Sequence, residues 1–132
     1  MRAFLIVTAC CIAVVLILSL RTRITVRLAA KRRCGYTERD LLQALASKGI
    51  PDIVARAVAA GFRKWASAIV PDFPVMPTDR LSFYHPIVAY DYEDILDEML
   101  RASGKQWREK AFPYSLVTVE DVARFVAGCE AA

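Results

Sequence analysis

The first part of the chain is a long apolar run. Residues 3–20 contain no charged residue, no proline and no glycine, and their only hydroxyl side chains are those of Thr8 and Ser19. At about 1.5 Å per residue, a helix of this length reaches about 27 Å, close to the roughly 30 Å hydrocarbon layer of a bilayer. An unbroken helix also satisfies its own backbone hydrogen bonds, as lipid requires. The pattern predicts a transmembrane helix over residues 1–20.

Two cleavable signals share this apolar pattern and stay open as alternatives. A secretory signal peptide needs a small-x-small cleavage site after the run, where this chain has Ser19-Leu20-Arg21. A lipoprotein signal needs a lipobox, which Val7-Thr8-Ala9-Cys10 resembles. The apolar residues before Cys10 are fewer than is usual for such a signal, and the strongest apolar run follows that cysteine. A membrane span therefore explains the segment best.

After residue 36 the apolar positions recur at helical spacing, in segments separated by glycine and proline. Thr37 and Thr118 are each followed three residues later by an aspartate, a pattern typical of helix starts. Pro71 ends the longest apolar stripe, and Gly104 is suited to cap the segment before it. The predicted helices cover residues 37–48, 53–70, 91–103 and 118–126.

Two connections carry apolar and aromatic residues that we expect to pack inward. The first, residues 71–90, contains Pro71, Pro74, Pro77 and Pro86 and is expected to be ordered. Its inward residues are expected to be Leu81, Phe83, Tyr84, Ile87 and Val88. In the second, residues 105–116, Trp107 and Phe112 are expected to fill the core. Alternation typical of a strand is confined to residues 116–119.

These patterns predict an all-α protein, in which an N-terminal transmembrane helix precedes a small bundle of four to five helices. The 132 residues leave room for one small domain. Hydrophobic residues make up 56% of the chain, which argues against disorder. The expected organisation is a transmembrane helix at 1–20, a basic juxtamembrane segment at 21–36 and a helical domain at 37–132.

The sequence from about residue 51 to residue 126 resembles the acyl carrier protein fold. That family has a long first helix, a long loop ending before a leucine, an acidic second helix, a short third segment and a last helix that opens with a hydroxyl residue and Val or Ile. The matching features here are, in order, residues 53–70, Pro77-Thr78-Asp79-Arg80-Leu81, residues 91–103, the region around Phe112, and Thr118-Val119-Glu120-Asp121-Val122. The resemblance implies a carrier-like bundle over most of the helical domain.

The resemblance does not extend to the family's prosthetic group. Carrier proteins attach phosphopantetheine to the serine of a D-S-L motif at the start of the second helix. The matching positions here are Asp91-Tyr92-Glu93, and Ser82 lies too early in the loop to replace that serine. Tyr92 lies in the apolar half of its helix, so we expect its ring to pack and its phenol to reach a hydrogen-bond partner. The fold is therefore expected without a cofactor.

The acidic second helix is, by the same resemblance, a surface onto which basic partners would dock. A solvated helix face is the alternative explanation of such a charge run, since most surface charges contribute little binding energy. The candidate docking residues are Asp91, Glu93, Asp94, Asp97 and Glu98.

The charges are divided unevenly along the chain. The whole chain has 18 basic and 14 acidic side chains and a net charge of +4, but residues 1–33 hold 7 of the basic and none of the acidic ones. Residues 34–132 therefore have 11 basic against 14 acidic side chains, a net charge of −3. Because only Arg2 precedes the apolar run, the positive-inside rule predicts a cytoplasmic helical domain. The candidate contacts to anionic lipid headgroups are Arg21, Arg23, Arg27, Lys31, Arg32 and Arg33.

A nucleic-acid partner is not expected, because no aromatic residue lies between these cations to stack on bases. No set of residues predicts a catalytic or metal site either. The four cysteines form no C-x-x-C motif and are expected as free thiols in a reducing cytoplasm. His85 is the single histidine, and no neighbour in sequence would orient it as a base. Carboxylates on an open helix face stay solvated, the opposite of what acid-base catalysis needs.

The sequence thus favours a membrane-anchored, non-catalytic interaction module with an acyl-carrier-like fold but no prosthetic group. Its expected partners are membrane lipids, through residues 1–33, and a protein with a basic surface. A first alternative is a small single-pass accessory subunit of a larger membrane complex, packed through small residues such as Ala9 and Ala13. A second, which the residues support least, is an enzyme acting on lipid or acyl substrates.

Overall fold

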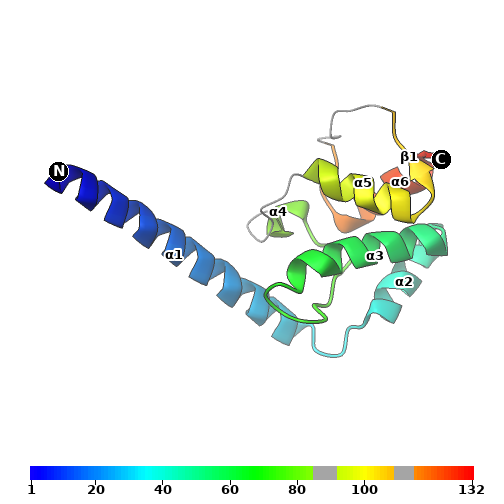
Figure 1. The fold of residues 1–132 in the computed structure, drawn as a ribbon. Coiled ribbons are helices and arrows are strands. Elements are labelled where there is room, and N and C mark those ends of the chain that lie inside the picture. The colour runs from blue at the N-terminus through cyan, green and yellow to red at the C-terminus, as the bar shows by residue number, and fades with distance from the viewer. Residues whose placement is uncertain (85–91, 109–114) are drawn as a thin grey trace.

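A computed structural model describes residues 1–84, 92–108 and 115–132 of the chain. It has the expected all-α class: the described residues form helices and two very short strands (Figure 1). The elements are α1 (Arg2–Arg32), α2 (Glu38–Ser47), α3 (Asp52–Ala66), α4 (Leu81–Tyr84), α5 (Tyr92–Ala102), β1 (Lys105–Gln106), α6 (Val119–Gly128) and β2 (Glu130–Ala131).

Helix α1 has 31 residues and is therefore about 46 Å long. It projects from the bundle formed by the other helices, which we call the body (Figure 1). Its apolar side chains from Phe4 to Leu20 are exposed. The juxtamembrane segment, expected as a separate part of the chain, continues the same helix as far as Arg32. Six residues beyond the apolar run, Val26 is only 1% exposed because it packs into the core of the body.

The two predicted threonine caps are confirmed. Thr37 and Thr118 are N-caps in extended backbone, and each forms a capping box with the aspartate three residues later. In the second box the hydroxyl of Thr118 accepts the N–H of Asp121 at 3.2 Å, and the Asp121 carboxylate accepts the N–H of Thr118 at 2.8 Å. These caps fix the starts of α2 and α6.

Helix α3 is the centre of the body and contacts α2, α5 and α6. It ends at Ala66, four residues earlier than the sequence predicted, and the chain continues in turns towards Pro71. A proline ring clashes with the carbonyl four residues before it, so Pro71 disrupts the helix well ahead of its own position. Gly61 allows the close approach of α5, because a Cβ atom there would lie 2.5 Å from Met99 Cε.

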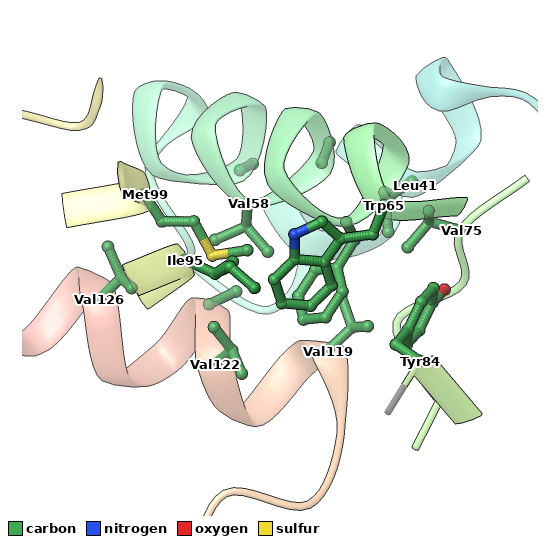
Figure 2. Close-up of a cluster of buried hydrophobic side chains, with 14 of the residues drawn as sticks. Leu41, Val58, Trp65, Val75, Tyr84, Ile95, Met99, Val119, Val122 and Val126 are labelled. Atoms are coloured by element: carbon green, nitrogen blue, oxygen red, sulfur yellow. The ribbon is translucent and has the colours of Figure 1, made fainter. Parts of the chain in front are cut away.

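The core is rich in aromatic rings that come from α3 and from α4, a helical turn inside the proline-rich connection (Figure 2). Phe62 lies with its ring centroid 5.3 Å from that of Trp65 and 5.0 Å from that of Tyr84. Leu81 and Tyr84 are buried as expected, and Phe83 is half-buried. Trp107 is half-buried against Phe125, and its role as a core residue is thus only partial. Ile87, Val88 and Phe112 lie outside the described residues.

Short strand pairings join the ends of the body, which the sequence did not predict. Lys105 and Gln106 of β1 pair antiparallel with Ala131 and Glu130 of β2. Strands of two residues are too short to show an alternating pattern in the sequence. Of residues 116–119, where the sequence alternates as in a strand, Thr118 forms an isolated antiparallel bridge with Arg80, whereas Val119 already begins α6.

Candidate functional site

The most elaborate polar cluster of the described chain lies where α1 meets the body, around Asp79. This carboxylate is buried, with a side chain that is 5% exposed. Arg33 binds it with both terminal nitrogens, Nη2 to Oδ1 at 2.5 Å and Nη1 to Oδ2 at 2.8 Å. Oδ2 also accepts the Tyr84 hydroxyl at 2.7 Å and the backbone N–H of Met76 at 2.9 Å. We call Arg33, Asp79 and Tyr84 the junction triad.

Local structure brings the three residues together. Arg33 is the C-cap of α1, and Gly35, with φ of 92°, turns the chain away just after it. Asp79 closes a turn in which its N–H bonds to the carbonyl of Met76, and its own carbonyl accepts the N–H of Val119 in α6. The turn that contains Asp79 therefore precedes α4 and is hydrogen-bonded to the end of α1 and to the start of α6.

Two phenylalanine rings enclose the guanidinium of Arg33. Its Cζ lies 5.3 Å from the ring centroid of Phe73 and 5.7 Å from that of Phe83. Arg33 Nη1 also donates to the carbonyl of Pro74 at 2.9 Å. Such stacking and fork-like hydrogen bonding suit arginine and not lysine.

The electrostatics of the junction triad favour a fixed, neutral tyrosine. Burial first, and the negative charge of Asp79 second, raise the pKa of the Tyr84 phenol above its usual value of 10.0. Tyr84 is 0% exposed and keeps its proton to donate to Asp79. Because Asp79 Oδ2 accepts three donors and Oδ1 is held by Arg33, the cluster is built to hold α1 on the body and offers no open position for a substrate.

This arrangement corrects the expectation for Arg33 as a headgroup contact. Its side chain is 17% exposed and its guanidinium is already bound by Asp79 and Pro74. The other five predicted cations are exposed, and none of them forms an ion pair with a residue that the structure describes. We call these five the basic collar: Arg21, Arg23, Arg27, Lys31 and Arg32.

The acidic residues predicted for partner docking lie together on the exposed face of α5. Glu93, Asp94, Asp97 and Glu98 are exposed, while Asp91 lies outside the described residues. Glu98 bonds to Lys64 of α3 at 2.8 Å, so its charge is partly neutralised. Asp94 and Asp97 form no ion pair within the described ranges.

The cysteines are free thiols, as expected. Cys10, Cys11 and Cys34 are exposed, and Cys129 is half-buried. Burial raises the pKa of the Cys129 thiol, which disfavours the reactive thiolate. Among the described residues no group of three or more His, Cys, Asp or Glu side chains could hold a metal ion. His85 falls outside them.

Sequence reasoning missed the role of Asp79. In the sequence Asp79 stands only as part of the loop before Leu81, and its partner Arg33 lies 46 positions away in the chain. The one local signal is an acidic residue among apolar neighbours such as Val75, Leu81 and Phe83, which would have suggested a buried charge in need of a cation.

Tyr92 is built into the packing, as expected from its place in the apolar half of its helix. Its hydroxyl donates to the carbonyl of Leu81 at 2.6 Å, and its ring lies edge-on to Trp65 with centroids 6.0 Å apart. Burial raises the pKa of its phenol.

No protein-family model, no curated protein and no solved structure matches the chain.

Proposed function

We propose that the protein is a single-pass, membrane-anchored interaction module whose helical body is held at the membrane surface by the junction triad. One observation carries the proposal: the described residues contain one helix long and apolar enough to cross a membrane, and that helix is continuous with a segment packed on the body. Its apolar part is unburied in the molecule, so that lipid would be a suitable environment for it.

The body faces the cytoplasm in this proposal. The basic collar follows the apolar run, and only Arg2 precedes it. Positive charge next to a span stays on the cytoplasmic side during insertion. The collar then lies beside anionic headgroups, where each cation adds roughly 1 kcal/mol of attraction.

The body acts by binding a protein and not by catalysis. Its best-organised buried polar groups, the junction triad, bond to one another and leave no open position. The exposed acidic face of α5 is the surface that a basic partner would complement. We also propose that the body is an acyl-carrier-like bundle without phosphopantetheine. In the resemblance to that family, Tyr92 stands where carrier proteins have the serine that bears this group.

Membrane fractionation and a reporter fused after Ala132 test the anchor and its orientation. The full chain should stay in the membrane after carbonate extraction, and the reporter should be cytoplasmic. Intact mass should equal that of the uncleaved polypeptide. Export of the reporter, cleavage after the apolar run, or acylation at Cys10 would each contradict the proposal.

A further inference from the structure

A groove of about 430 Å³ lies between α1 and α4, at the point where the apolar run of α1 ends. Leu18 and Phe83 are among its apolar walls. Its polar walls include Arg21, Thr22 and Ser82. We call this feature the junction groove.

The position of the junction groove along α1 places it at the edge of a bilayer, if α1 spans one as proposed above. A hydrocarbon layer of roughly 30 Å takes up about 20 helical residues. Leu18 then lies at the edge of the hydrocarbon, and Arg21 lies almost one turn further, among the lipid phosphates. The groove therefore opens at the depth where a headgroup meets its glycerol backbone.

Two polar side chains of the groove, those of Arg21 and Ser82, can bind an anion. The Arg21 guanidinium forms no ion pair with a described residue, although arginine is well matched to phosphate through paired N–H donors. Ser82 is exposed on α4, where its hydroxyl can donate into the groove. The hydroxyl of Thr22 donates to the carbonyl of Leu18 at 2.9 Å and so stabilises the helix wall.

We propose that the junction groove binds one anionic phospholipid of the surrounding leaflet, with the headgroup phosphate on Arg21 and Ser82 and the glycerol and first acyl carbons against Leu18 and Phe83. This inference rests on the proposed membrane anchor and adds a defined site to it. The cations of the basic collar attract anionic lipid as a whole, whereas the groove holds a single molecule by its shape and by Arg21.

The test is a lipid titration of the full-length protein in a mild non-ionic detergent, followed by native mass spectrometry. Phosphatidylglycerol should add as one saturable adduct, with zwitterionic phosphatidylcholine binding more weakly. Arg21→Gln should weaken phosphatidylglycerol binding by at least about tenfold, and Ser82→Ala by a few-fold, because hydrogen bonds to charged groups are lost.

Arg27→Gln is the matched control. It removes the same charge from the same collar, but at 3.6 residues per turn Arg27 lies about 120° around α1 from Arg21 and does not line the groove. Its effect should stay within about twofold, as is usual for an exposed charge.

The possible results separate the two proposals. Equal losses in Arg21→Gln and Arg27→Gln would overturn the groove and leave only diffuse attraction by the collar. Full competition by inorganic phosphate would also overturn it, since the site would then be one for a free anion. Release of the wild-type chain by carbonate would contradict the membrane anchor itself, and the groove proposal would fail with it. Retention in the membrane with loss of binding only in Arg21→Gln and Ser82→Ala supports both.

Discussion

At the scale of single residues, the junction triad decides how the molecule is held together. Asp79 is buried and must be compensated, and the structure supplies Arg33 from another element and Tyr84 from the same connection. A buried charge is destabilising when its partner is removed, even where the pair as a whole adds little stability. Separating α1 from the body would leave Asp79 without its counter-charge, so the triad keeps the two together.

Asp79→Asn should lower the free energy of unfolding by about 3–5 kcal/mol, because it leaves the guanidinium of Arg33 without its counter-charge. Urea unfolding of the full chain in mild detergent, followed by circular dichroism, measures this. Asp52→Asn is the matched control: it breaks the exposed pair with Arg56 and should cost no more than about 0.5 kcal/mol. Equal effects of the two substitutions would show that the junction pair is not buried in solution.

Tyr84 should make stability fall at alkaline pH. Its pKa is raised in the folded protein, so the contribution of the neutral phenol is complete below pH 10.0, the usual pKa, and is lost as pH rises towards the folded pKa. The loss from this one group is at most about 1.4 kcal/mol per pH unit.

Tyr84→Phe should therefore flatten the decline in unfolding free energy between about pH 10 and 12, while lowering stability at neutral pH through the lost bond to Asp79. Urea unfolding at a series of pH values measures both effects. Tyr92→Phe, which removes a less buried hydroxyl, should flatten the decline less. Parallel pH curves for the wild type and Tyr84→Phe would contradict the role of this phenol.

At the scale of elements, the features that local chemistry determines could be predicted. Thr37 and Thr118 act within four residues, so a hydroxyl followed by an acid was enough to find the starts of α2 and α6. The apolar stripes of α3 and α5 were equally visible because helical spacing is a short-range pattern. The α4 turn inside the proline-rich connection was not found, since four residues are too few for a period.

Contacts between distant elements could not be predicted in this way. Nothing in the pattern around Arg33 distinguishes it from the cations beside it, and only the geometry of the end of α1 directs it inward. The same holds for Val26, whose burial depends on where the body lies and not on its own helix. The exposure of the basic collar and of the described acidic residues of α5 could therefore be predicted from the sequence, whereas the buried junction triad could not.

The last turns of α1 belong to the body, which determines where the chain can be cut. A fragment of residues 35–132 loses both Arg33 and Val26, so the buried Asp79 is left without its counter-charge and the core loses a side chain. We expect it to be at least about 3 kcal/mol less stable than a fragment of residues 21–132 in urea unfolding. Introducing Asp79→Asn into the longer fragment should remove most of this difference. Equal unfolding midpoints for the two fragments would contradict the assignment.

The acidic face of α5 can be tested without disturbing the fold. Replacing Asp94 and Asp97 by asparagine should change stability by no more than about 0.5 kcal/mol, because both residues are exposed. Recovery of partners cross-linked to the full chain should fall if this face binds them.

Gln43→Lys together with Ser47→Lys is the control for the acidic face, since it changes the net charge by the same amount on exposed positions of α2. Partner recovery should be unaffected by this pair. Unchanged recovery in the aspartate variant as well would identify the face as solvated only.

At the scale of the whole molecule, charge and shape are segregated along one axis. An exposed apolar helix leads to the basic collar and then to a body whose net charge is −3 by sequence. No cation of the collar forms an ion pair with a residue that the structure describes, so its positive charge is not neutralised by such a pair. A molecule of this kind orients itself at an anionic surface before any specific contact forms.

Because α1 continues into the body as one helix, α1 and the body should move together as a rigid unit. No flexible hinge separates the apolar run from the segment that Val26 and Arg33 attach to the core. In a bilayer, helices answer a change of hydrocarbon thickness by tilting, and a tilt of about 10° displaces the end of a helix about 46 Å long by about 8 Å. Since the body turns with that end, the angle of α5 to the membrane surface would follow the thickness of the membrane.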